Sequence, residues 1–321
     1  MLAMNHRITV GTWRLGMIDS VKIHKSVETL SDTSIVVLPG TYINAGIDIE
    51  SFIHTGDEVT IKLGYDDDLK TEFKGYLKSI QTDDGSITLE CEDSLYLWRV
   101  PLDDIQLSNI SLKALLQKVS SQVSATSGKI YNVVCDYDFN YEKFTFYKAS
   151  AIDVLKQVQE ETKANIYFAE DVLHIHAPYS QIRNAVPVVY DFAVNVEKSD
   201  LKYVKATDKN ISVEVTCLMP DGENKTVQYG SPHGTTKHKT IAASDVASAR
   251  TAAMSEFNLW CYDGYEGSIT GWLEPYVEPT YKVMIRDAEY PMKTGTYYVV
   301  STEVEFGSAG GVRKVTLGRR V

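Results

Sequence analysis

A pattern of three consecutive strands occurs twice in this chain, and it constrains the fold more than any other feature. In both copies an alternating strand leads to a strand that begins with glycine and carries aromatic residues. A glycine turn then leads to a closing strand that contains Thr-Leu. The first copy is Val59–Leu63, Gly75–Ile80 and Gly85–Glu90, and the second is Tyr281–Arg286, Gly295–Val304 and Gly311–Gly318. The identity is weak, but order and residue type agree, which predicts a duplicated β module.

Short strands also dominate the first hundred residues. Ile8 with Val10, and Val21 with Ile23, alternate with polar residues at period two. An apolar run that starts at Ser34 stops at Pro39-Gly40. Six or so short strands without a helical period indicate a small barrel or sandwich, and we assign residues 1–104 to it.

Two helices are predicted in the middle of the chain. Ser108 or Ser111 can cap the first, and Ser150 can cap the second, with an acidic residue in its first turn. The apolar stripe of the first helix comprises Leu112, Leu115, Leu116, Val119 and Val123. A hairpin across Glu170-Asp171 follows, so residues 105–182 are predicted to form a small α/β domain.

Strands return after that domain and continue to the C-terminus, with one helical interruption. The predicted second β-barrel domain is therefore split into 183–230 and 265–321, with a short helical insertion at 231–264. The expected fold class is α+β and mainly β. It has two similar antiparallel β-barrel modules, an intervening small α/β domain and a short helical insertion.

The charge of the chain excludes some function classes. A formal net charge of −11 disfavours a grip on nucleic-acid phosphates or adsorption to an anionic membrane. The one basic cluster is Arg313, Lys314, Arg319 and Arg320, interpreted as a solvated strand end. A run of about 18 apolar residues is missing, so no membrane-spanning helix is predicted, and no secretory signal is visible.

The four cysteines are far apart in sequence. Cys91, Cys135, Cys217 and Cys261 form no Cys-x-x-Cys pair, so buried free thiols made in a reducing cytoplasm are expected.

Three constellations could carry chemistry, and each has a simpler interpretation. His174 and His176 share one face of a strand, but zinc needs a third ligand, so a hairpin edge with two imidazoles is favoured. Asp66–Asp68 lacks the ligand pattern of a calcium loop and reads as an acidic loop tip.

The third constellation is Ser199 to Lys202 with Lys293–Gly295, which mimics two motifs of serine β-lactamases. An alternating strand would point Ser199 and Lys202 to opposite faces. We therefore predict no catalytic, cofactor-binding or metal-binding residue, and no cofactor.

The order of modules resembles one known family. A β module with Gly56–Ile61 and Phe73–Leu77 is followed by helices at Ser111–Leu116 and Ala151–Thr162 and by the hairpin up to His176. The chain then closes with Gly295–Val300 and Val315–Leu317. This is similar to the baseplate hub proteins of contractile-tailed bacteriophages, the late control protein D family. It is also similar to the hub part of type VI secretion spike proteins.

The resemblance implies a homotrimeric structural hub that is not an enzyme. It would be a virion component, assembled in the bacterial host cytoplasm, that adapts a sixfold tail tube to a threefold spike around a central channel. Implied partners are the tail tube, spike, tape-measure and baseplate wedge proteins, with DNA only in passage and no membrane insertion. The alternatives are a tail-associated cell-wall hydrolase and a surface-carbohydrate-binding β module. Trp98 and Trp272 fit either an interface or the core.

Overall fold

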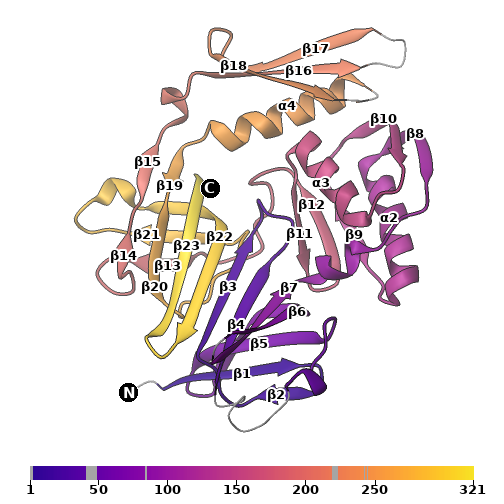
Figure 1. The fold of residues 1–321 in the computed structure, drawn as a ribbon. Helices are drawn as coiled ribbons and strands as arrows, with labels where there is room; N and C mark the ends of the chain where they lie inside the picture. Colours follow the sequence, from indigo (N-terminus) through magenta and orange to yellow (C-terminus); the bar gives the residue numbers. More distant parts are fainter. Residues whose placement is uncertain (1–2, 41–48, 84, 219–222, 242, 244) are drawn as a thin grey trace. The chain divides into compact units, whose positions relative to one another are not determined.

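The computed structural model describes the chain except residues 1–2, 41–48, 84, 219–222, 242 and 244 (Figure 1). The chain divides into two compact units that interleave in sequence. The first unit contains Met1–Tyr96, Ile182–Lys202 and Tyr265–Val321, and the second contains Leu97–Gln181 and Tyr203–Gly264. Each unit is described by itself below.

The N-terminal part of the first unit is an antiparallel β module. Its strands are β1 (Met4–Val10), β2 (Trp13–Leu15), β3 (Ser20–Ser26), β4 (Thr33–Pro39), β5 (Glu58–Tyr65), β6 (Asp68–Asp83) and β7 (Ser86–Glu92), with a 3-10 turn at Ile49–Ser51. A further 3-10 turn, Ser94–Arg99, contains the point in the sequence where the second unit begins. The alternation seen in the sequence buries one face of each strand. On β5, for example, Val59, Ile61 and Leu63 are buried in the core.

The C-terminal part of the first unit is a second β module. Its strands are β13 (Val188–Asp191), β14 (Lys198–Ser199), β20 (Ser268–Trp272), β21 (Lys282–Arg286), β22 (Gly295–Gly307) and β23 (Gly310–Arg320), with a 3-10 turn at Pro291–Lys293. Strands β15 (Lys202–Val204) and β19 (Gly264–Glu266) lie where the chain crosses between the units.

The strand order of the first β module recurs in the second. The order β3-β4-β7-β6-β5-β1 corresponds to β14-β20-β23-β22-β21-β13. In both modules a long middle strand pairs first with the strand before it and then, past a register shift, with the closing strand. One pairing differs, because β13 runs parallel to β21 whereas β1 runs antiparallel to β5. The repeat predicted from the sequence is thus present in the topology.

The two modules are joined edge to edge. Ser20–Ser26 of β3 pairs antiparallel with Ser301–Gly307 of β22, so both modules belong to one sheet (Figure 1). In the described residues this sheet is open, and its main path ends at β14 and β2. The fold is mainly β with separate helices, as predicted, but closed barrels are not observed.

The first part of the second unit has two helices that pack on small sheets. Its elements are β8 (Ile105–Ser111), α2 (Leu112–Ser127), β9 (Asn132–Cys135), β10 (Asn140–Phe146), α3 (Ala151–Thr162), β11 (Asn165–Ala169) and β12 (Val172–His176). Ser111 caps α2, and Gly128 ends it with a positive φ of 72°. Ser150 and Asp153 form a capping box at the start of α3. Both predicted helices and their caps are confirmed.

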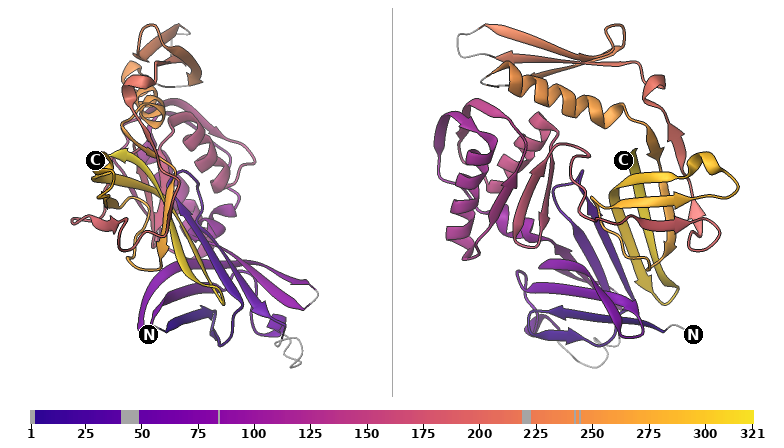
Figure 2. Two further views of the ribbon diagram at one scale, coloured as in Figure 1. Left: turned by 90° about the vertical axis from the view of Figure 1, so that its left-hand side faces the viewer. Right: turned by 180° about the vertical axis from the view of Figure 1, so that it is seen from behind.

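The rest of the second unit is a three-stranded sheet with one helix. Strand β16 (Ile211–Leu218) lies between β17 (Asn224–Gly230) and β18 (Thr235–Ile241), after a 3-10 turn at Ala206–Asp208. Helix α4 (Val246–Trp260) runs along one face of this sheet (Figure 2). Strands β16 and β17 fall within the range 183–230 of the sequence, yet they pair with β18 and not with the second β module. The predicted division into domains stays a prediction. The described helices include none that is long and apolar enough to cross a membrane.

The edge-to-edge joint should be necessary for stability. Phe306 of β22 is 5% exposed and lies in the core cluster of the first β module. We expect Phe306→Ala to lower the free energy of unfolding by about 3–5 kcal/mol, because it leaves a cavity there. Its neighbour Glu305 is exposed, so Glu305→Ala should cost at most about 1 kcal/mol. Urea denaturation of both variants measures this, and equal stabilities would contradict the expectation.

Candidate functional site

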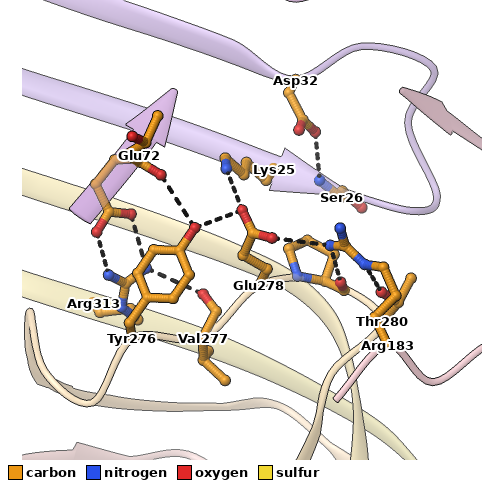
Figure 3. Close-up of polar contacts among 12 residues, drawn as sticks. Lys25, Ser26, Asp32, Glu72, Arg183, Tyr276, Val277, Glu278, Thr280 and Arg313 are labelled. Carbon is orange, nitrogen blue, oxygen red and sulfur yellow. Dashed lines mark hydrogen bonds and ion pairs between the residues drawn. The ribbon is translucent and has the colours of Figure 1, made fainter. Parts of the chain in front are cut away.

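A buried polar cluster lies where the two β modules meet (Figure 3). Glu72 of β6 enters it because of a β-bulge. Ile61 of β5 lies opposite Phe73, and Lys62 lies opposite Thr71, so Glu72 is the extra residue. A bulge turns a side chain away from its regular face, and Glu72 is only 2% exposed.

Arg313 of β23 meets this carboxylate from the second β module. Its Nη2 lies 2.6 Å from Glu72 Oε1 and its Nη1 3.1 Å from Oε2, a bidentate pair. The Arg313 side chain also donates to the carbonyl oxygens of Leu273 and Val277. Burial alone would lower the pKa of Arg313, but the Glu72 carboxylate raises it, so the guanidinium stays charged.

A second ion cluster continues the first. The guanidinium carbon of Arg313 lies 5.1 Å from the centre of the Tyr276 ring, and Tyr276 Oη donates to Glu278 Oε1 at 2.7 Å. Lys25 Nζ of β3 lies 2.8 Å from Glu278 Oε1, and Arg183 Nη2 lies 3.1 Å from Oε2. Burial would raise the pKa of Glu278, but these two cations outweigh it and lower the pKa to about 2.

Half-buried Asp32 interacts with Lys25, and buried Asp93 lies beside Asp32. Asp32 Oδ1 accepts a hydrogen bond from the Ser26 N–H, and Asp93 Oδ2 accepts one from the Asp32 N–H. Burial raises the pKa of Asp32 to about 6, although Lys25 and the Ser26 N–H oppose the shift. Burial and the nearby Asp32 also raise the pKa of Asp93. The Asp32 carboxyl group is therefore partly protonated at pH values below neutral.

The arrangement is that of a joint between modules. Its charged groups face one another and the backbone, and in the described residues their hydrogen bonds are made within the protein. Breaking such a network exposes uncompensated charge, so it fixes one arrangement of the modules. A catalytic group would instead need to face a substrate.

The two candidate histidines, His174 and His176, lie close together, but on a central strand and not on the expected hairpin edge. Strand β12 is the central strand of the order β11-β12-β9, so the predicted hairpin edge is wrong. His174 Nδ1 lies 3.2 Å from His176 Nε2, which confirms that both rings share one face. His176 Nδ1 lies 2.7 Å from Asp136 Oδ1, in the segment after β9. Among the described residues no group of three or more His, Cys, Asp or Glu could hold a metal ion.

The other sequence candidates remain apart from any site. Asp66 and Asp67 link β5 to β6 at the predicted loop tip, and Asp68, the first residue of β6, pairs with Lys70. Ser199 ends β14, and its Oγ accepts from the Leu201 N–H, while Lys293 pairs with Asp287. The predicted continuous strand at Ser199–Lys202 is interrupted between β14 and β15.

The cysteines and tryptophans fall into different environments. The four cysteines are free thiols; Cys91 and Cys217 are buried, and the other two are partly buried. Trp98 is fully buried in the second unit, whereas Trp272 is 59% exposed on β20. Core packing thus accounts for Trp98 alone.

The basic cluster at the C-terminus was misinterpreted in part. Lys314, Arg319 and Arg320 are exposed, but Arg313 is 1% exposed and pairs with Glu72. The period-two alternation could have predicted that Arg313 is buried, because Arg313 occupies the same face of β23 as Val315 and Leu317. Its partner could not be found, since Glu72 is 241 residues away in sequence.

Comparison with known proteins identifies the fold. No protein-family model matches the sequence, and no curated protein sequence does. Solved structures do match. A tail protein from Neisseria meningitidis MC58 has a TM-score of 0.71 at 11% identity, over 99% of this chain and 97% of that one. The 43 kDa tail protein of prophage MuSo2 from Shewanella oneidensis has a TM-score of 0.67 at 13% identity, over 98% of both chains.

A third match comes from a secretion system. The E. coli c3393 protein is described as a component of the type VI secretion system that is similar in structure to the T4 bacteriophage tail proteins gp27 and gp5. It matches with a TM-score of 0.59 at 9% identity, over 98% of this chain and 76% of that one. At such identities the likeness establishes the fold alone. The chain has the fold of phage tail proteins, which agrees with the resemblance inferred from the order of modules.

Removal of one partner of the buried ion pair should be costly. We expect Glu72→Gln to lower the free energy of unfolding by about 3–5 kcal/mol, because Arg313 then stays buried without a counter-charge. The single variants Glu72→Met and Arg313→Met and their double variant form a cycle with the unmodified protein, and the double variant should lose less than the sum of the two single losses. Urea denaturation of the four proteins gives the coupling, and additive losses would show that the pair is not a joint. The exposed pair of Asp68 and Lys70 is the control, and Asp68→Asn should cost at most about 1 kcal/mol.

Asp32 should give the stability an unusual pH dependence. Its pKa rises from the ordinary 3.8 to about 6, so the folded state binds the proton more tightly. The free energy of unfolding should therefore fall as the pH rises from about 4 to about 6. Asp32→Asn keeps the acceptor for the Ser26 N–H and should make this decline smaller, with buried Asp93 supplying the remainder, so the variant should be the more stable protein at pH 8.

Glu278 supplies a control of opposite sign. Its lowered pKa stabilises the fold above pH 4.5 and loses this effect as the pH falls towards about 2. Glu278→Gln should thus destabilise the protein at neutral pH. Thermal unfolding between pH 3 and pH 8 compares the variants. A parallel pH profile for Asp32→Asn and the unmodified protein would contradict the assignment.

Proposed function

We propose that this chain is a structural subunit of a phage-type tail baseplate, a hub protein of the late control protein D type. In this proposal three copies form a ring with a central channel, and each copy contributes two tube-like barrel modules. The ring adapts a sixfold tail tube to a threefold spike. The chain carries no catalytic residue or cofactor for this role.

The observation that carries the proposal is the recurrence of one strand order in a single chain. Three copies of a chain with two equivalent modules present six similar modules around one axis. Such a ring can match the sixfold symmetry of a tube with its six similar modules. The three identical chains themselves are related by threefold symmetry. The full-length likeness to tail proteins from Neisseria and Shewanella supports the same role.

The proposal includes the partners that the resemblance implies. The tail tube would dock on one face of the ring and the spike on the other, with the tape-measure and wedge proteins as further neighbours. The type VI component among the similar structures is itself described as similar to two T4 tail proteins. A net charge of −11 suits a channel through which DNA passes without binding, because like charges repel.

The buried ion cluster has a clear task in such a hub. A ring that holds a spike under the force of tail contraction needs modules that keep their positions. Arg313 and Glu278 connect both modules through charged hydrogen bonds, and the pairing of β3 with β22 adds a backbone connection. The joint would keep the pseudo-sixfold spacing constant.

The mass of the protein in solution tests the proposal. We expect a species of three times the chain mass of 35.9 kDa, measured by analytical ultracentrifugation or native mass spectrometry. Phe306→Ala, which weakens the joint, should reduce the trimer fraction, and Glu305→Ala, which changes an exposed side chain, is the matched control. A strict monomer that binds neither tube nor spike protein would contradict the proposal. Digestion of peptidoglycan by the purified protein would favour the hydrolase instead.

A further inference from the structure

Two stretches of strand edge in the first unit lack a partner among the described residues. Strand β6 pairs with β5 up to Tyr76 and with β7 from Tyr76 to Asp83. The other edge of Lys78–Asp83 therefore has no neighbouring strand. Strand β14 pairs with β20 on one side only and ends the main path of the sheet. Open edges present unpaired backbone groups to another chain.

The internal repeat shows what such edges can bind. In the second module β22 corresponds to β6, and its later half, Ser301–Gly307, is flanked by β23 on one side and by β3 on the other. Strand β3 corresponds in turn to β14, because each pairs with the strand next to the closing strand. The edge of β22 that pairs with β3 therefore corresponds to the open edge of β6. The edge of β3 that pairs with β22 corresponds to the open edge of β14.

The hairpins set the register of the correspondence. Gly307 lies opposite Gly310 in one module, and Asp83 lies opposite Ser86 in the other. Counting back from these turns, Glu305 corresponds to Gln81. Along the neighbouring strands, Lys22 lies opposite Ile35, which lies opposite Glu90.

The same comparison of opposite residues across β14, β20 and β23 of the second module identifies the residue that would lie opposite Gln81. Lys198 lies opposite Thr270, which lies opposite Lys314, and Lys314 occupies the place of Glu90. Lys198 therefore corresponds to Lys22, and both are lysines. Within the chain, Lys22 lies directly opposite Glu305.

We propose that β14 of one copy pairs antiparallel with Lys78–Asp83 of β6 in the next copy, with Lys198 opposite Gln81. This inference rests on the proposed homotrimeric hub and gives it a specific contact. Joints within a chain and joints between chains would then alternate around the ring. The contact is head to tail, because each copy offers one edge of each kind. In the proposed ring the rotation from one copy to the next returns to the first copy after three steps.

Side chains at the open edge agree with a missing partner. Ile80 is only partly buried, whereas Val304, its counterpart beside β3, is 2% exposed. Lys22 in the filled joint pairs with Glu303 and Glu305 at 2.6 and 2.9 Å. At the open edge Ser79 and Gln81 both donate to Glu90, which places a carboxylate beside β6. Glu90 would be the counter-charge of Lys198, which is exposed in the single chain.

Disulfide trapping tests the register. In the double variant Gln81→Cys with Lys198→Cys, oxidation should link copies of the chain, because directly opposed strand residues fit disulfide geometry. On a denaturing gel we expect a band of three linked chains that disappears on reduction. Lys22→Cys with Glu305→Cys is the positive control, since the same pair should close within one chain. The unmodified protein and both single variants give the background of the four native cysteines.

A register control uses the covered half of β6. Lys74 is exposed but lies opposite Thr60 of β5, so Lys74→Cys with Lys198→Cys should remain unlinked. If the protein is trimeric by mass and the positive control closes, absence of the Gln81–Lys198 link overturns the edge pairing and leaves the hub intact. A monomer by mass with no link overturns both. A ladder beyond three chains overturns the closed ring.

Discussion

The ion pair between Glu72 and Arg313 is the interaction on which the rest of the first unit depends. It joins the middle strand of one β module to the closing strand of the other, at a place where both side chains are almost fully buried. A buried charge is tolerated only with its partner, so each module requires the other in one position. The neighbouring cluster at Glu278 adds Lys25 and Arg183 to the same joint.

The backbone reinforces this constraint. Strand β3 belongs to the N-terminal module by sequence, yet it also pairs with β22, and Phe306 of β22 packs in the N-terminal core. Two modules that share a sheet and a core cannot drift apart without loss of both. A chain with a repeated strand order thereby becomes one sheet with two similar β modules. The proposed threefold adaptor to a sixfold tube requires this property.

Much of this architecture was predictable from local patterns. Alternation on β5, and the caps Ser111 and Ser150, specify their elements because the relevant contacts lie within a few residues. The repeat predicted the common strand order for the same reason. Long-range contacts were not predictable. The partner of Arg313 is Glu72, and that of His176 is Asp136, each brought close only by the fold. The placement of β16 and β17 also depended on pairing with β18, which no local pattern reveals.

The central claim is that two modules per chain become six modules in a closed ring. Electron microscopy of the purified protein at a resolution that separates strands tests it most directly. The account predicts a threefold ring in which β14 of each copy lies beside β6 of the next, so that one sheet continues around the ring. A threefold ring in which β6 and β14 both face solvent, or particles of a single chain, would contradict it.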